Sequence, residues 1–186
     1  MALVALKIFH ERGLFQRLQL DVRTAMNFFC TVHLTYKQYP EVKFHNDLHG
    51  TDVLHSVHCC LNAPALNQVF SDLEIFAALV AAAVHDVAHP GATNNFLIKT
   101  GHDLALLYND TSVLENHHIS TTFKIMQDSH CNILSGFSRG LFPPPPFFFL
   151  LLIMLWLRPS APKKIQVYYF RFLSSLHADM LTSYPT

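Results

Sequence analysis

The chain has 186 residues, which suits one ordinary domain with a sizeable buried core. Its 13 Lys and Arg balance 13 Asp and Glu, and a formal net charge of zero argues against electrostatic binding to nucleic acid or to an anionic membrane. The 13 histidines are unusual because they equal the acidic residues in number.

The N-terminus and the cysteines bear on where the protein is located. The first residues lack a basic segment followed by a long apolar run, so we expect no signal peptide. Adjacent Cys59 and Cys60 are poor candidates for a disulfide, and none of the four cysteines forms a C-x-x-C pair. We therefore expect reduced thiols in a cytoplasmic protein.

Helical patterns dominate residues 1–138. Apolar residues recur at three- and four-residue spacing before Pro40 and predict an amphipathic helix that ends near this proline; they are Val22, Met26, Phe29, Val32 and Tyr36. No alternating strand pattern competes in this region. We predict an all-α fold, a bundle of several helices.

Two Ser-x-x-Glu sequences predict capping boxes at helix starts. The first, at residues 71–74, precedes the run IFAALVAAAV, which is so apolar that we expect a central buried helix. This helix should end at His85, because a Pro-Gly pair at residues 90–91 prevents its continuation. The second, at residues 112–115, predicts a helix through about Gln127.

The composition changes after residue 138. Four consecutive prolines at residues 143–146 forbid a helix and favour polyproline II. The apolar run at residues 147–157 has 11 residues, short of the roughly 17–25 of a spanning helix, so we expect no membrane span. The segment IQVYYFRFL beyond it could form a strand. We predict a helical domain over residues 1–138 and an irregular, Pro-rich apolar tail over residues 139–186.

Three short clusters, HNDLH, HDVAHPG and ENHH, gather imidazoles and carboxylates. His45 and His49 are four residues apart, which on a helix puts both rings on one face. This suits two ligands, or one ligand and one proton-transfer group; the alternative is a pair of surface histidines. His85 and Asp86 follow a buried apolar helix, and a buried carboxylate needs a cation or several hydrogen bonds. A metal ion bound by both would supply that cation, and the alternative is a polar helix end.

The remaining histidines and the third cluster are more ambiguous. Glu115 fits a structural role as the glutamate of the second capping box. His117 and His118 point about 100° apart on a helix, so we expect at most one of them to face a site. His55 and His58 have no carboxylate beside them, and we interpret them as packing or surface residues.

The available ligand atoms are oxygen and nitrogen. Zn²⁺ suits two histidines and an aspartate, whereas a carboxylate with waters suits Mg²⁺ or Mn²⁺. Two such ions lower the pKa of a bound water toward about 7 and clamp the oxygens of a phosphoryl group. The residues alone therefore predict metal-dependent hydrolysis of a phosphoester.

The same segments resemble the class I 3′,5′-cyclic nucleotide phosphodiesterases, most of all the cAMP-specific type 4, dunce-like branch. The segments FHNDLHGTDV, PALNQVFSDLEIFAALVAAAVHDVAHPG, NNFLI, LALLYND and SVLENHH follow that family's order and spacing. The resemblance covers about residues 4–137, roughly the first half of a catalytic domain. It implies an incomplete version of the family's HD-type helical bundle.

The resemblance also implies a two-metal site. His49, His85 and Asp86 match ligands of a tightly held Zn²⁺. Asp86 further matches the carboxylate that bridges to a second ion, usually Mg²⁺. His89 and Glu115 match groups that hold the waters of the second ion and the bridging hydroxide.

His45 matches the general acid that protonates the departing ribose 3′-oxygen. The implied reaction is in-line attack of the hydroxide on the cyclic phosphate of cAMP, giving a 5′-nucleotide in cyclic-nucleotide signalling. The substrate is the one partner that this resemblance implies.

Some positions depart from the family. Ala88 stands where the family has a second Asp, and loss of a carboxylate beside the metals typically costs about 10–100-fold in affinity or activity. Phe44 replaces the usual Tyr. The fourth metal ligand, an Asp, and the residues that grip the purine have no recognisable counterpart, although His177-Ala178-Asp179 is faintly similar to the motif of that ligand.

The tail is typical of sequence that does not complete this fold, as in a truncated gene model, a retained intron or a splice variant. The helices near residues 71–84 and 112–127 would then expose apolar faces, which predicts aggregation or association. Three hypotheses follow: a cyclic nucleotide phosphodiesterase, a non-catalytic isoform that binds partners through these faces, or a different hydrolase on the HD-type scaffold.

Overall fold

The computed structural model describes residues 1–37, 39–64 and 70–137. All regular structure in these ranges is helical, which confirms the predicted all-α fold. The eight helices in these ranges are α1 (Ala2–Glu11), α2 (Leu14–Arg17), α3 (Val22–Tyr36), α4 (Asp47–Leu61), α5 (Asp72–Val84), α6 (Asn94–Lys99), α7 (Asp103–Leu107) and α8 (Val113–Gln127).

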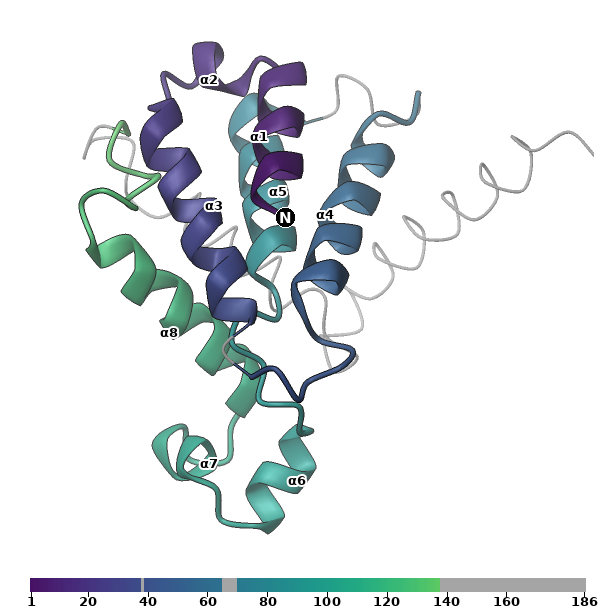
Figure 1. Cartoon of the computed structure of the whole chain (residues 1–186), viewed down its shortest axis with the longest axis vertical. Coiled ribbons are helices and arrows are strands. Elements are labelled where there is room, and N and C mark those ends of the chain that lie inside the picture. The colour runs from purple at the N-terminus through teal and green to yellow at the C-terminus, as the bar shows by residue number, and fades with distance from the viewer. Residues whose placement is uncertain (38, 65–69, 138–186) are drawn as a thin grey trace, which may run out of the picture.

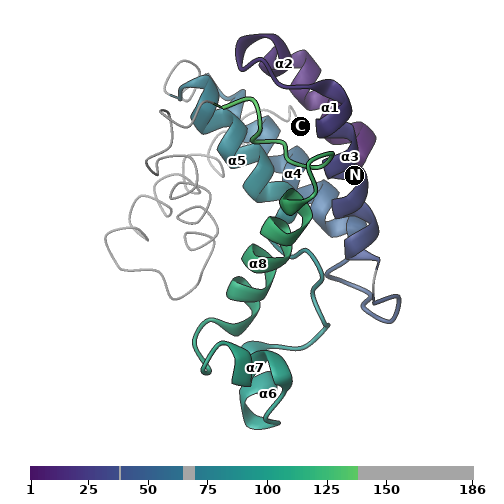
Figure 2. The ribbon, with the colours of Figure 1, turned by 90° about the vertical axis from the view of Figure 1, so that its left-hand side faces the viewer.

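The longer helices form one bundle (Figure 1). Helices α1, α3 and α4 pack around α5, and α8 packs against α3 and α5. The short helices α6 and α7 pack on each other and on α8 at the far end of the molecule, as the second view also shows (Figure 2). The three histidine clusters meet where the loop before α4, the end of α5 and the first turns of α8 come together.

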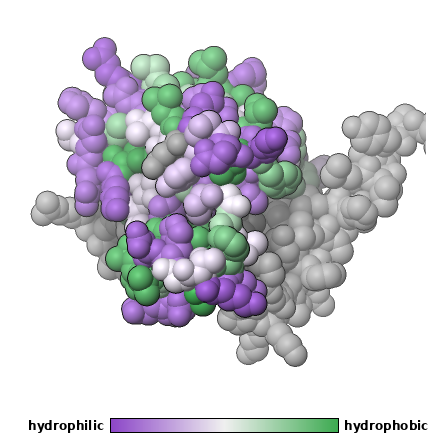
Figure 3. Space-filling view, turned by 60° about the horizontal axis from the view of Figure 1, so that its bottom comes forward, coloured by the Kyte–Doolittle hydropathy of each residue, from purple (hydrophilic) through white to green (hydrophobic). Residues whose placement is uncertain are grey.

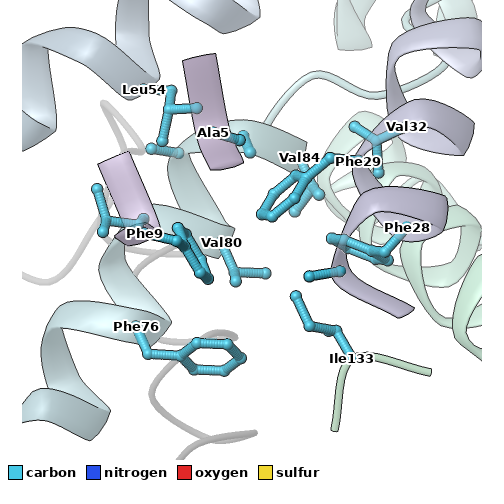
Figure 4. Close-up of a cluster of buried hydrophobic side chains, with 14 of the residues drawn as sticks. Ala5, Phe9, Phe28, Phe29, Val32, Leu54, Phe76, Val80, Val84 and Ile133 are labelled. Atoms are coloured by element: carbon cyan, nitrogen blue, oxygen red, sulfur yellow. The ribbon is translucent and has the colours of Figure 1, made fainter. Parts of the chain in front are cut away.

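Helix α5 is the centre of the core, as its apolar sequence predicts. Eight of its 13 residues are buried. Aromatic rings from the neighbouring helices close around it (Figure 4). The ring of Phe9 on α1 lies 5.2 Å from that of Phe29 on α3 and 5.9 Å from that of Phe76 on α5, centroid to centroid. This core holds the C-terminal end of α5 in place, and His85 and Asp86 follow directly after it.

Helix α3 ends at Tyr36, shortly before Pro40 as predicted, and three of the five predicted apolar positions, Phe29, Val32 and Tyr36, are buried. Val22 and Met26 are 55% and 43% exposed, and Ala25 and Phe28 are buried in their place. The helix starts at Val22 because the Asp21 side chain accepts a hydrogen bond from the backbone of Thr24. The apolar spacing alone could not show that Val22 and Met26 face away from the core.

The two predicted capping boxes have different outcomes. Ser71 and Glu74 form the complete box at the start of α5, with both reciprocal hydrogen bonds present. The box at Ser112 is wrong, because Ser112 has a left-handed backbone with φ of 51° and its side chain makes no capping bond. Asn94 of α6 replaces it: its Oδ1 accepts from the Leu114 N–H at 2.9 Å.

Replacing Ser71 and Ser112 by alanine should distinguish the serine that caps a helix from the serine that does not. Ser71→Ala is expected to lower the free energy of unfolding by about 1 kcal/mol, because it removes an N-cap acceptor. Ser112→Ala should change it by less than about 0.5 kcal/mol, because no capping bond is lost. Urea unfolding followed by circular dichroism measures both. Equal losses in the two variants would contradict this assignment of the caps.

The predictions for the proline run, the apolar run, the strand and the tail over 139–186 fall outside the described residues. Within the part of the chain that the structure describes, no helix is long and apolar enough to cross a membrane. On the face shown in Figure 3, hydrophobic residues lie in small groups among hydrophilic ones. The most exposed large hydrophobic side chains described lie on neither α5 nor α8; examples are Leu3, Leu48 and Leu106.

Candidate metal centre

The end of α5 presents two neighbouring side chains to one site. His85 is the C-cap residue, and its Nδ1 lies 2.9 Å from the carbonyl oxygen of Ala82. A carbonyl only accepts, so Nδ1–H must be the donor, and the lone pair of His85 Nε2 is free when the ring is neutral. This is the arrangement in which a backbone carbonyl orients a metal-binding imidazole.

Three ligand atoms converge in front of this lone pair. His49 Nε2 lies 3.1 Å from His85 Nε2 and 3.3 Å from Asp86 Oδ2. His85 Nε2 lies 3.1 Å from the same carboxylate oxygen. Zn²⁺ bonds of about 2.0–2.1 Å in a tetrahedron place their ligand atoms about 3.3 Å apart. The three predicted ligands are therefore brought together at distances that fit one Zn²⁺ ion.

The charges around Asp86 support a cation site. Burial alone would raise the pKa of Asp86, but hydrogen bonding to His85 and the charge of that ring hold it well below its usual range. Burial alone would lower the pKa of His85, but the hydrogen bond and charge of Asp86 raise it above its usual value. Burial lowers the pKa of His49. The carboxylate is thus anionic at neutral pH and faces nitrogen atoms that a proton or a metal ion can occupy.

The second carboxylate oxygen faces another group. Asp86 Oδ1 lies 3.7 Å from Nε2 of His118, and ligand atoms of Asp86, His89 and His118 all lie within 4.8 Å of one another. Within the described ranges, this group and the one with His49 are the two sets of three residues that could hold a metal. Asp86 belongs to both sets.

Hydrogen bonds distinguish the two imidazoles of this second group. His118 donates from Nδ1 to the Val87 carbonyl at 2.7 Å, so its Nε2 is an acceptor. His89 accepts at Nδ1 from the Gly91 N–H at 2.9 Å, so its neutral ring carries a proton on Nε2. Burial lowers the pKa of each ring to about 4, which keeps both neutral at pH 7. His118 is suited to bind a cation, and His89 is suited to donate a hydrogen bond to an oxygen.

His45 reaches the site from a loop. The expectation that it shares a helix face with His49 is wrong, because Asn46 caps α4 and the helix begins at Asp47. The His45 ring instead stacks on His89, with centroids 4.0 Å apart and planes at 14°. A Cβ at Gly91 would lie 2.9 Å from Val42 Cγ2, so the loop that carries His45 fits closely only because this residue is glycine.

The third cluster contributes one side chain that sequence reasoning missed. His118 faces Asp86, whereas His117 donates from Nε2 to the Ala88 carbonyl, so one of the two faces the site, as expected. The available signal was helical spacing, since His118 shares the buried face of α8 with Thr122. Glu115 is in neither of the two described metal groups, and its carboxylate accepts from Asn94 Nδ2 at 3.1 Å.

Ala88 has an unfavourable backbone for its residue type. It is 2% exposed with φ of 58°, in the left-handed region that Asp and Asn adopt more readily than Ala. The cyclic nucleotide phosphodiesterases that the sequence resembles have an aspartate at this position, and aspartate would suit that backbone better. The departure at Ala88 therefore affects local backbone energy as well as the charge near the candidate ligands.

Comparison with known proteins identifies a family for this chain. Residues 44–142 match the family described as 3′5′-cyclic nucleotide phosphodiesterase. The mouse protein "3′,5′-cyclic-AMP phosphodiesterase 4C" is 44% identical over 135 residues, which are 73% of this chain and 19% of that protein. The "Probable 3′,5′-cyclic-AMP phosphodiesterase pde-4" of Caenorhabditis elegans is 40% identical over 139 residues, which are 75% of this chain and 20% of that protein.

A solved structure shows the same relationship. The phosphodiesterase domain of Salpingoeca rosetta rhodopsin phosphodiesterase aligns with a TM-score of 0.74 and 31% identity, covering 83% of this chain and 46% of that chain. The present chain spans about a fifth of the length of these two curated relatives. The sequence resemblance is confirmed, and the chain belongs to the 3′,5′-cyclic nucleotide phosphodiesterase family.

Proposed function

We propose that the chain takes part in metal-dependent hydrolysis of a 3′,5′-cyclic nucleotide, cAMP, to the 5′-monophosphate. The observation that carries the proposal is the convergence of His49, His85 and Asp86 within 3.3 Å of one another, with the His45 ring 5.6 Å from that of His49. The names of the curated relatives supply the substrate. Four unpaired cysteines support the cytoplasmic location that we propose with it.

The donor atoms suit the two ions that the family implies. His49, His85 and Asp86 would hold Zn²⁺, because two imidazoles and a carboxylate are ligands that Zn²⁺ prefers. Asp86 Oδ1 would bind Mg²⁺ or Mn²⁺ with waters, and the His118 nitrogen beside it favours Mn²⁺ over Mg²⁺. When bound, such ions supply a Lewis acid and a water acidified toward a pKa of about 7.

The chain's own residues would divide the remaining work. His89, with its proton on Nε2, would donate a hydrogen bond to an oxygen in the second group. Glu115, oriented by Asn94, would help to order the waters there. His45 would deliver a proton to the departing 3′-oxygen, and its stacking on His89 limits the positions of its ring.

A hydrolysis assay on purified protein with metal analysis tests the proposal. His45→Gln should lower kcat by about 10²–10⁴-fold with unchanged metal content, because it removes a general acid but no ligand. His130→Gln, a matched change at an exposed histidine, should keep full activity.

Three other results would point elsewhere. Unchanged hydrolysis in His45→Gln would refute the role of His45. Stoichiometric metal without hydrolysis of cAMP would support the non-catalytic isoform. Hydrolysis of other phosphoesters in preference to cAMP would support a different hydrolase on this scaffold.

A further inference from the structure

We propose that Tyr36 positions the metal ligands His49 and Asp86, a role that rests on the metal centre of the proposed function. Tyr36 is the last residue of α3 and is 3% exposed. Its hydroxyl oxygen accepts a hydrogen bond from the backbone N–H of Asp86 at 3.1 Å. The contact joins residues 50 positions apart in the sequence.

This hydrogen bond replaces the usual helical hydrogen bond of the Asp86 N–H at the end of α5. In a continuing helix, the Asp86 N–H would donate to the carbonyl of Ala82. Here the Ala82 carbonyl accepts from His85 Nδ1 at 2.9 Å, and the Asp86 N–H donates to Tyr36. The Tyr36 hydroxyl therefore accepts from the Asp86 N–H, whose usual helical acceptor is taken by the His85 side chain. These two hydrogen bonds together orient the side chains of His85 and Asp86.

The ring of Tyr36 also contacts the helix that carries His49. Gly50 follows His49 directly and is buried. A Cβ at Gly50 would lie 2.6 Å from Met1 Cε, 2.9 Å from Tyr36 Cζ and 3.0 Å from the Tyr36 hydroxyl oxygen, so it would press on both side chains. The phenol thus fits between α4 and the end of α5 because position 50 has no side chain, and it sets the distance between two ligand-bearing segments.

The chemistry of the group suits this role. Burial raises the pKa of the Tyr36 hydroxyl far above its usual value, so the group stays neutral. A neutral hydroxyl can accept from the Asp86 amide without adding negative charge beside the Asp86 carboxylate. The Tyr36 hydroxyl contacts the backbone amide of Asp86, so Tyr36 acts on the centre by holding a ligand in place.

The test compares zinc affinity in Tyr36→Phe and Tyr108→Phe. Tyr108 is the matched control, because its hydroxyl is hydrogen-bonded to Ser120 Oγ at 2.6 Å, in a partly buried contact remote from Asp86 in sequence. Competition with a chromophoric chelator gives the affinity, and the Co²⁺ absorption spectrum reports ligand geometry. Tyr36→Phe should bind zinc about 10–100-fold more weakly with an altered spectrum, and Tyr108→Phe should bind as the unmodified chain does.

A second variant guards against loss of folding. Gly50→Ala retains the hydroxyl but presses on the Tyr36 ring as well as on the Met1 side chain, and it should weaken zinc binding in the same direction with helical content preserved. Zinc affinity unchanged in Tyr36→Phe, or lowered equally in Tyr108→Phe, would overturn the inference. Tight zinc binding by the unmodified chain without hydrolysis of cAMP would refute the proposed function alone and leave the Tyr36 comparison valid. Absence of zinc binding by the unmodified chain would overturn both.

Discussion

Asp86→Asn is expected to abolish stoichiometric zinc binding and to preserve the helical fold. Asp86 Oδ2 lies 3.1 Å from His85 Nε2 and 3.3 Å from His49 Nε2. The amide is nearly the same size, so packing survives, but it removes the negative charge that compensates the cation. Because loss of a supporting group typically costs about 10–100-fold in affinity, loss of a ligand shared by both groups should exceed about 100-fold.

The measurement is metal content after dialysis together with isothermal titration of the metal-free protein. Asp52→Asn is the matched control, since Asp52 is an exposed aspartate on α4. It should retain zinc and unfold at the same urea concentration as the unmodified chain. Retention of zinc by Asp86→Asn would show that the ion binds elsewhere and would remove the basis of the candidate centre.

Phe9→Ala is expected to lower the free energy of unfolding by about 3–5 kcal/mol. Phe9 is fully buried, and its ring lies within 5.9 Å of the rings of Phe15, Phe29 and Phe76, centroid to centroid. Those rings belong to three different helices, so the neighbours cannot all close on the cavity. A loss of this size is a large fraction of the roughly 5–15 kcal/mol that stabilises an ordinary domain.

Urea unfolding followed by circular dichroism measures this loss. Phe96→Ala provides the comparison, because Phe96 is 58% exposed on α6 and should cost less than about 0.5 kcal/mol. The two variants remove the same side chain and differ in burial. Similar unfolding midpoints for both would mean that the ring cluster around Phe9 is not the core of this domain.

Local sequence patterns predicted three of the long helices, α3, α5 and α8. The apolar run before His85 and the Ser71 box gave α5, because both signals depend on residues within one segment. The exposure of Val22 and Met26 on α3 and the capping bond of α8 were not predictable in this way. Which positions of α3 face the core depends on the neighbouring helices, and the Leu114 N–H in the first turn of α8 is capped by Asn94, 20 residues earlier in the chain.

In the candidate site, too, local sequence identified some residues and tertiary packing determined the others. His85 and Asp86 were identifiable because an acidic residue directly after a buried helix needs compensation. Which of His117 and His118 faces Asp86 follows from how α8 packs, and the loop position of His45 follows from the cap at Asn46. Tyr36 looked like one apolar position of an amphipathic helix, and only its contact with the Asp86 amide reveals another role.

The external cap of α8 has a consequence for the order of folding. Helix α5 carries its own start signal in Ser71 and Glu74, so its first turn can form before distant segments meet. The first turn of α8 takes its acceptor from Asn94, and the same side chain holds Glu115. We therefore expect the first turn of α8 to become stable only when α6 docks on it, later than the first turn of α5.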